Sequence, residues 1–438
     1  WGTATATHSW AQLGSGSATT TTGLATNTQH TISVAAVNGD STNTTTFSAT
    51  ASLFTNATVP NLPTLSSTGA QNLLITMATD TNPAANTTFI VKDTNASVGL
   101  KYLQTNGTWG NATATHSWAQ LGSGSATTTT GLATNTQHTI SVAAVNGDST
   151  ATSTYSSTAS IYTMGAVPNT ATLSTVGQQT LRITMATDTN PAANTSYVVK
   201  DTNASVGLKY LQTDATWGTA TATLTWFQLG GGAATTTIGL ATSTSHTISI
   251  AAVNGDSSAT TTYSSTVSLS TLAENPSAPT LSSVGEQTLR ITMVTSTNPA
   301  GNTTYIIKDT NASVGLKYLQ TDATWGTATA TLTWFQLGAG AVTTTIGLAT
   351  NTQHTVSIAA VNDDSSATTT YSSTVSLYTM GAVPNASTLS STGAQNLRII
   401  MATDTNPAAN TTYIVKDTNA SVGLKYLQTD ATWGTATA

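Results

Sequence analysis

Four histidines recur at one position of an internal repeat, and they are the residues with the clearest capacity for acid–base chemistry. They lie 108 residues apart, at His30, His138, His246 and His354. Histidine titrates near neutral pH, so it can act as a general acid or base when a carboxylate orients it. The sequence around each copy is small or hydroxylic, with no carboxylate at a fixed neighbouring position. We therefore expect a structural hydrogen bond at a chain corner and assign no catalytic or cofactor-binding residue.

A second pair of histidines supports the same conclusion. His8 and His116 occupy equivalent positions, but the later copies carry Leu224 and Leu332 there. A catalytic residue is not expected to vanish from equivalent domains of one working array. The chain is therefore predicted not to be an enzyme.

Oxygen ligands suited to calcium occur in two places in the repeat. They are the segments Asp80-Thr81-Asn82 and Asp93-Thr94-Asn95. However, Ser296 replaces the first aspartate in one copy, and no glutamate is nearby. Capping of turns by Asp and Asn explains the pattern more simply. We expect no metal and no cofactor, with calcium as the alternative.

Asparagine sequons of the form Asn-x-Ser/Thr provide candidate glycosylation sites. With so much threonine and serine many matches arise by chance, and we leave open whether any of them is used. The candidates recur in pairs, at Asn86 and Asn95, Asn194 and Asn203, Asn302 and Asn311, and Asn410 and Asn419.

The composition excludes several classes of partner. Only 6% of the residues are charged, against roughly 25% in ordinary soluble proteins, and the net charge of −6 is thinly spread. Without a basic patch, nucleic acid and anionic membranes are poor partners. No apolar run approaches the roughly 18 to 20 residues of a membrane span. With no cysteine, there is no disulfide framework or thiolate site.

The repeat itself fixes the domain organisation. Trp-Gly recurs at Trp1, Trp109, Trp217, Trp325 and Trp433, each time after 108 residues with no insertion or deletion. This period far exceeds the roughly 20 to 45 residues of a solenoid repeat and suits a domain with its own core. We divide the chain into a C-terminal half-repeat at 1–56, whole repeats at 57–164, 165–272 and 273–380, and an N-terminal half-repeat at 381–438.

Within one repeat the hydrophobic pattern has a period of two and shows no helical periodicity. Leu73, Ile75 and Met77 alternate with Leu74 and Thr76, as in a half-buried strand. Asn-Gly turns, such as the one after Asn38, separate further short runs. About seven strands in about 100 residues predict an all-β, antiparallel sandwich. The other predicted strands are 88–92, 102–104, 117–121, 127–132, 138–145 and 153–162.

The repeat resembles fibronectin type III domains. TTYIVKD, at residues 411–417, is similar to their third strand, and GLATNTQHTISVAAVN, at residues 131–146, is similar to their E-to-F corner and F strand. The longer middle, KYLQTDATWGTATATLTWFQLG at residues 209–230, resembles the enlarged type III-like repeats of large bacterial surface proteins. The resemblance implies a tandem array of Ig-like β-sandwich domains.

Two departures from that family affect the expected core. The recurring corner histidines stand where the family has tyrosine. Methionine, at Met77, Met185, Met293 and Met401, replaces the family's buried tryptophan on the second strand. We expect tryptophans on another strand to fill the core instead. These are Trp10, Trp118, Trp226 and Trp334.

Repetition and low charge together favour a structural role. The array is predicted to be a subunit of an extracellular or cell-surface filament, stalk or fibre that associates with itself. The alternative is an adhesin, or the spacer region of a secreted carbohydrate-binding or carbohydrate-active protein. Trp109 and Tyr102 would then stack on glycans if exposed together, although core packing is the simpler expectation for at least one of them.

The two half-repeats leave two interpretations open. The simpler one is that these residues are a window from a longer array. The other is that the half-repeat 1–56 of one chain completes the half-repeat 381–438 of the next, which would polymerise chains by strand exchange.

Overall fold

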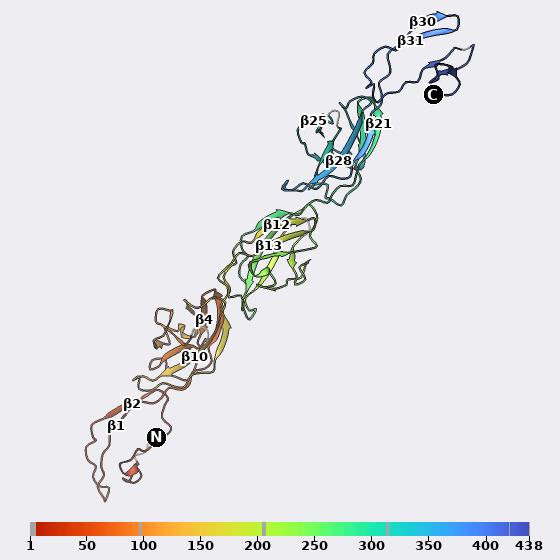
Figure 1. The fold of residues 1–438 in the computed structure, drawn as a ribbon. Helices are drawn as coiled ribbons and strands as arrows, with labels where there is room; N and C mark the ends of the chain where they lie inside the picture. The colour runs from red at the N-terminus through yellow and green to blue at the C-terminus, as the bar shows by residue number, and fades with distance from the viewer. Residues whose placement is uncertain (1–5, 96–98, 204–206, 312–314, 420, 438) are drawn as a thin grey trace.

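The computed structural model describes residues 6–95, 99–203, 207–311, 315–419 and 421–437. They form an elongated row of β-sheet units, with the two termini at opposite ends (Figure 1). Trp1 and Gly2, the first copy of the repeated Trp-Gly pair, lie outside the described residues. None of the helices found among the described residues is long and apolar enough to cross a membrane.

The repeat at 57–164 is a sandwich of two antiparallel sheets. The smaller sheet has the order β3-β4-β9, and the larger has the order β11-β10-β5-β6-β7 with β8 also paired to β5. The strands are β3 (Thr64–Gly69), β4 (Asn72–Thr76), β5 (Thr88–Asp93), β6 (Lys101–Leu103), β7 (Trp109–Gly110), β8 (His116–Ser117), β9 (Thr127–Thr129), β10 (Gln137–Val145) and β11 (Ala159–Tyr162). This is the predicted all-β, fibronectin type III-like sandwich.

The same sheets recur in the next two repeats, so the fold has the 108-residue period of the sequence. The second repeat contains β12 (Thr172–Gly177), β13 (Thr180–Thr184), β14 (Ser196–Asp201), β15 (Lys209–Leu211), β16 (Trp217–Gly218), β17 (Leu224–Thr225), β18 (Ala234–Thr236), β19 (Ser245–Val253) and β20 (Val267–Ser270). The third contains β21 (Thr280–Gly285), β22 (Thr288–Thr292), β23 (Thr304–Asp309), β24 (Lys317–Leu319), β25 (Trp325–Gly326), β26 (Leu332–Thr333), β27 (Val342–Thr345), β28 (Gln353–Val361) and β29 (Val375–Tyr378).

The segments at the two ends contain parts of the same sandwich. The first segment has the strands β1 (Gln29–Ile32) and β2 (Ala51–Phe54). The last has β30 (Thr388–Gly393), β31 (Asn396–Ile400), β32 (Lys416–Asp417), β33 (Lys425–Leu427) and β34 (Trp433–Gly434). Side chains that are buried in whole repeats are uncovered here. Leu289 is fully buried, for example, whereas its equivalent Leu397 is 59% exposed.

The core lies between the two sheets and follows the predicted alternation. On β4, Leu73 and Ile75 are fully buried, and Met77 follows them into the core. Trp118 packs against this cluster as expected, but it is half-buried and lies in the turn after β8 and not on a strand. Its ring centroid lies 5.9 Å from that of Phe89. Trp226 and Trp334 make equivalent contacts with Tyr197 and Tyr305. Trp10, in the first half-repeat, is 70% exposed.

Three predicted strands are wrong in detail, and one of them, expected over 127–132, ends at Thr129. The strand expected over 117–121 ends at Ser117, where a reciprocal pair of bonds with Gln120 closes a turn. This turn leads into a single 3-10 turn, η2 (Gly122–Gly124). The equivalents of η2 are η1 (Gly14–Gly16), η3 (Gly230–Gly232) and η4 (Gly338–Gly340).

The strand expected over 153–162 is regular only over β11. Before it, the backbone N–H groups of Ser153 and Ser156 donate to the carbonyl oxygens of Ala144 and Val142, and the two serine hydroxyls accept the N–H groups of the same residues in place of backbone carbonyls. The pattern also failed to indicate β3, whose sequence Thr-Leu-Ser-Ser-Thr-Gly carries little hydrophobic signal.

Candidate functional site

The corner histidines are each paired with a buried aspartate. His138 Nδ1 lies 2.6 Å from Asp93 Oδ2, and both side chains are fully buried. The other carboxylate oxygen, Oδ1, accepts the backbone N–H groups of Thr139 and Asn95, each at 3.0 Å. His246 with Asp201 and His354 with Asp309 repeat the arrangement at 2.6 and 2.5 Å.

This pairing corrects the expectation that the histidines lack a carboxylate partner. The aspartate lies 45 residues earlier in the chain, at the end of β5, and cannot be recognised from the local sequence. Strands β5 and β10 are adjacent and antiparallel, with Asp93 opposite Ile140, so their pairing brings the carboxylate to the corner. The expected structural bond at the corner is present, with aspartate as the acceptor.

A histidine oriented by aspartate could serve as a catalytic base only if its second nitrogen reached a substrate or nucleophile. Here Nε2 of His246 faces the backbone carbonyl oxygen of Ala241 at 3.4 Å, and His354 faces Ala349 in the same way. The rings are buried, so the geometry supports a fixed link between two strands.

His116 occupies a buried position and bonds through Nε2 to the carbonyl oxygen of Leu103 at 2.8 Å. Leu224 and Leu332 are equally buried at the equivalent positions, and His8 is exposed in the first half-repeat. The position therefore takes a side chain that fills the core, whether polar or apolar.

The two segments weighed as calcium ligands have partners within the protein. Asp80 Oδ1 accepts the backbone N–H of Asn82 at 2.9 Å, which is the turn capping expected there. Asp93 is held by the corner histidine. Within the described ranges, no three His, Cys, Asp or Glu residues come together in a group that could hold a metal ion.

The equivalents of Asp80 interact with a core tyrosine. The Tyr197 hydroxyl lies 3.3 and 3.4 Å from the two carboxylate oxygens of Asp188. Burial raises the pKa of Tyr197, and the negative charge of Asp188 raises it further. In the third repeat, the Tyr305 hydroxyl meets Ser296. In the first repeat Phe89 replaces this tyrosine, and Asp80 Oδ2 is buried without a hydrogen-bond partner.

The glycosylation candidates fall into two structural classes. Asn95, Asn203 and Asn311 are only 6 to 7% exposed, so a glycan does not fit on these side chains in the folded repeat. We therefore withdraw these three candidates. Each lies two residues after the end of β5 or its equivalent, where the chain passes the buried corner. Asn419, their equivalent in the last half-repeat, is exposed.

The other four candidates, Asn86, Asn194, Asn302 and Asn410, lie where one repeat meets the next. The Nδ2 atoms of Asn86, Asn194 and Asn410 donate to a backbone carbonyl of the preceding repeat at 3.3 to 3.4 Å. Asn86, Asn194 and Asn302 are partly exposed, and Asn410 is exposed. These four remain candidates, at positions where a glycan would border the junction.

The linkers between repeats are held by one asparagine each. In the second repeat, Asn190 accepts the N–H of Ala166 at 2.6 Å and donates to its carbonyl at 2.9 Å. The side-chain carboxamide of Asn190 therefore bonds to both backbone groups of Ala166, as a neighbouring strand would, and fixes the linker. Asn82, Asn298 and Asn406 hold Thr58, Glu274 and Ala382 in the same way.

The aromatic pair considered for glycan stacking is half-buried. Trp109, Trp217 and Trp325 pack against the core clusters of the whole repeats, and the indole N–H of Trp109 is buried. Tyr102 is also half-buried. The core packing expected for at least one member of the pair is observed for Trp109.

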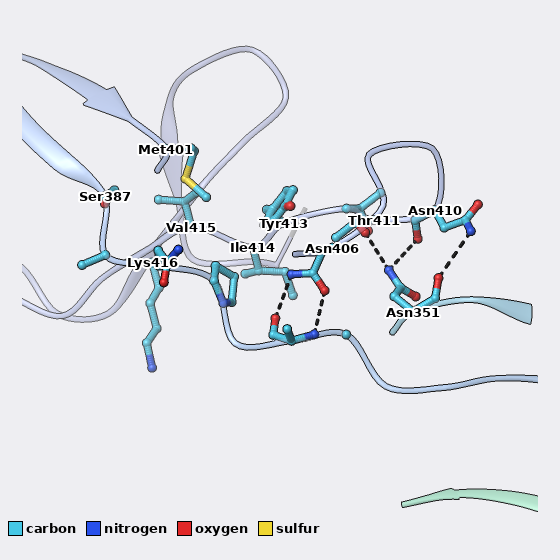
Figure 2. A pocket seen from close by; sticks show the side chains of 16 residues that line it. Asn351, Ser387, Met401, Asn406, Asn410, Thr411, Tyr413, Ile414, Val415 and Lys416 are labelled. Atoms are coloured by element: carbon cyan, nitrogen blue, oxygen red, sulfur yellow. Dashed lines mark hydrogen bonds between the residues drawn. The ribbon is translucent and has the colours of Figure 1, made fainter. Parts of the chain in front are cut away.

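A cleft of about 700 Å³ opens on the last half-repeat (Figure 2). Figure 2 shows Met401 and Tyr413 among its lining residues, and their equivalents Met293 and Tyr305 lie in the core of the third repeat. The cleft is thus the uncovered interior of this part of the sandwich. Asn351 borders it and bonds to Asn410 and Thr411.

Comparison with known proteins assigns the chain to no family. No family model matches the sequence, and no curated protein matches it. Among solved structures, it is similar to the FN1–FN3 domains of chicken CNTN1, at 15% sequence identity and a TM-score of 0.23. That match covers 74% of this chain and 99% of the other. The sheet order and its 108-residue period define a tandem array of Ig-like or fibronectin type III-like β-sandwiches.

Proposed function

We propose that this array is a structural subunit of an extracellular filament, stalk or surface fibre. The observation that carries the proposal is the recurrence of junction contacts from one repeat to the next. Each linker is fixed by its asparagine, and each corner carries a residue that bonds across the junction. Repeats joined in this way form an extended row whose length grows with their number (Figure 1).

Lateral association is supported by two features of the surface. Few charges oppose contact between copies, because only 6% of the residues are ionic. In addition, Phe227 and Phe335 occupy equivalent positions one repeat apart and are 75% and 71% exposed. Equivalent apolar side chains at a fixed spacing suit a lattice in which successive repeats make the same contact. The proposed partner is therefore a second copy of the chain.

Electron microscopy of the chain, with and without these phenylalanines, tests the proposal. We expect the unmodified chain to form straight rods that associate into filaments or bundles. The double variant Phe227→Ala and Phe335→Ala should remain as separate rods, because it lacks the exposed apolar side chains. The repeats should still fold, because the first whole repeat already carries Ala119 at this position. Isolated flexible rods from the unmodified chain would contradict the filament proposal.

That negative result would favour the spacer or adhesin alternative. Glycan-array binding of the unmodified chain and of Trp109→Ala would then test whether the half-buried aromatic residues bind sugars. Binding that is lost in the variant, with the repeat still folded by circular dichroism, would support an adhesin. An absence of glycan binding would leave the spacer role.

A further inference from the structure

Three positions at each junction vary together along the chain. The first is the last strand residue of a repeat, which we call the knob: Phe54, Tyr162, Ser270 and Tyr378. The second, which we call the socket, lies in the following repeat and faces the knob in the first two junctions, at Gly147 and Gly255; Asp363 is the equivalent residue in the third. The third is the corner residue with positive φ, at Asn27, Asn135, Ser243 and Asn351.

In the first two junctions an aromatic knob lies directly on a glycine socket. A Cβ atom placed on Gly147 would lie 2.5 Å from the Phe54 ring, and one placed on Gly255 would overlap the Tyr162 ring. Real side chains do not approach so closely, so any socket residue other than glycine would displace the ring. Neither glycine has a positive φ, so the ring, and not the backbone, is what requires glycine here.

The corner asparagine completes these two junctions. Asn135 Oδ1 accepts the N–H of Gly255 at 2.9 Å, and its Nδ2 donates to the hydroxyl of Thr195 at 2.6 Å. Asn27 makes the same bonds to Gly147 and Thr87. The backbone N–H of each knob donates a hydrogen bond to the aspartate that follows the socket. Tyr162 donates to Asp256, and Phe54 donates to Asp148.

The third junction differs at all three positions. Its knob is Ser270, which is fully buried, and its socket is Asp363. The bond from the knob's N–H to the following aspartate remains, from Ser270 to Asp364 at 3.1 Å. Ser243 reaches only the carbonyl of Asn302, and the hydroxyl of Thr303 is buried without a hydrogen-bond partner.

We propose that knob and socket are a matched pair that specifies which repeats can follow one another. An aromatic knob requires a glycine socket, and an aspartate socket requires a small knob. Tyr378 is an aromatic knob that contacts no socket in the described residues, and it is 45% exposed. Its matching partner is a repeat whose loop carries Asn-Gly-Asp, the sequence found at Asn38–Asp40, at Asn146–Asp148 and at Asn254–Asp256. The inference does not depend on the proposed filament function.

The absence of cysteine allows a direct test with pairs of spin labels in the full chain. Thr158, Thr266 and Thr374 are equivalent, exposed positions in successive repeats. Labels on Thr158→Cys and Thr266→Cys span the second junction, and labels on Thr266→Cys and Thr374→Cys span the third. Double electron–electron resonance then reports the distribution of distances across each junction.

We expect Gly255→Asp to broaden the distribution across the second junction and leave the third unchanged. Adding Tyr162→Ser should restore most of the original narrow distribution. In the third junction, Ser270→Tyr should broaden the distribution, and adding Asp363→Gly should narrow it again. Gly39→Asp is the matched control, because nothing lies within 4 Å of a Cβ at Gly39.

Two outcomes would overturn the proposal. One is a distribution across the second junction that Gly255→Asp leaves as narrow as in the unmodified chain. The other is a double variant that stays as broad as the single variant. Should Gly255→Asp prevent folding, Tyr162→Ala removes the ring without adding bulk. It should broaden the same distribution, and an unchanged distribution there would also contradict the matched pair.

Discussion

The buried histidine–aspartate pair is one of the few places where this chain puts charge-capable groups in its interior. The aspartate is satisfied by three donors, namely the ring and two backbone N–H groups. Removing one partner of such a buried pair leaves the other uncompensated, which is far more costly than losing an exposed pair. The pair therefore joins two strands at a fixed point in every whole repeat.

We expect Asp201→Asn to destabilise the second repeat by about 3 kcal/mol, because the carboxamide has one acceptor oxygen where the carboxylate has two. Either the His246 ring or the two backbone N–H groups that bond to Asp201 would then lose an acceptor in a buried site. Hydrogen–deuterium exchange resolved to that repeat by mass spectrometry measures the change. Asp214→Asn is the control, because Asp214 is exposed and bonds only to its own turn. Equal effects of the two substitutions would show that the corner pair is not important for stability.

A second residue-scale prediction concerns the unpaired oxygen of Asp80. Phe89→Tyr should stabilise the first repeat by about 1 to 2 kcal/mol, because the new hydroxyl would reach this buried carboxylate. The reverse change, Tyr197→Phe, should destabilise the second repeat by a similar amount. Urea denaturation of each variant, followed in its own repeat by hydrogen exchange, checks both. A loss of stability in Phe89→Tyr would indicate that the hydroxyl does not fit.

Among the residues, the sequence identifies one member of each buried histidine–aspartate pair. The recurring histidines and their structural role are predictable from their spacing and from the resemblance at the corner. Their partners, Asp93 and its copies, are not, because strand pairing brings them from 45 residues away. For the same reason the burial of Asn95 could not be anticipated from a sequon match.

Among the elements, most strands of the repeat were predicted, including β4 with its clear alternation and β6 without it, but β3 was not. The pattern of Leu73, Ile75 and Met77 gives β4 and its buried face directly. The strand β3 was missed because serine and threonine fill it, and they are common throughout the chain. The turn at Ser117 depends on a side-chain bond to Gln120, which hydrophobic periodicity does not report.

The third junction offers a prediction at the level of elements. Ser243→Asn should stabilise it by about 1 kcal/mol, since asparagine would reach the unpaired hydroxyl of Thr303 and tolerates a positive φ better than serine does. A narrower distance distribution between labels at positions 266 and 374 would confirm the effect. Ser265→Asn, at an exposed site of the same repeat, should change nothing.

A cleft of about 610 Å³ lies at this same junction, lined by residues of the second repeat, the linker and the third repeat. Ser243 makes one side-chain bond across this junction, whereas Asn135 makes three across the second, so the third junction is held by fewer bonds. In the unmodified chain we therefore expect a broader distance distribution across the third junction than across the second. Equal widths would show that the serine and aspartate pair holds the repeats as firmly as the ring and glycine do.

For the whole molecule, the aspartates that accept the N–H of each knob predict that the junctions loosen in acid. They are Asp148, Asp256 and Asp364. Hydrogen bonding from Thr150 and from the N–H of Phe54 lowers the pKa of Asp148. Burial raises the pKa of Asp256 and of Asp364, but hydrogen bonds from Ser258 and Ser366, respectively, and from the knob outweigh this effect, so the pKa of each is lowered. Each carboxylate therefore stabilises the array above its ordinary pKa of 3.8, and this contribution is lost as the pH falls below it.

We accordingly expect distances across all three junctions to stay narrow from neutral pH down to about pH 5 and to broaden below about pH 4. Measurements on labelled chain frozen at several pH values check this expectation. Asp256→Asn should remove most of the pH dependence across the second junction alone. Junctions that broaden near neutral pH instead would implicate groups other than these aspartates.

The position of the knob at the end of a repeat also bears on how such an array changes its copy number. Recombination between near-identical repeats removes whole units of 108 residues and leaves the reading frame intact. If the crossover between the first and second whole repeats falls before the knob, Ser270 still precedes Asp363. If it falls after the knob, Tyr162 is joined to that aspartate instead. Two crossovers that directly flank the knob give products of the same length that differ at this one residue. Selection for a matched junction would therefore favour one position of the exchange over the other.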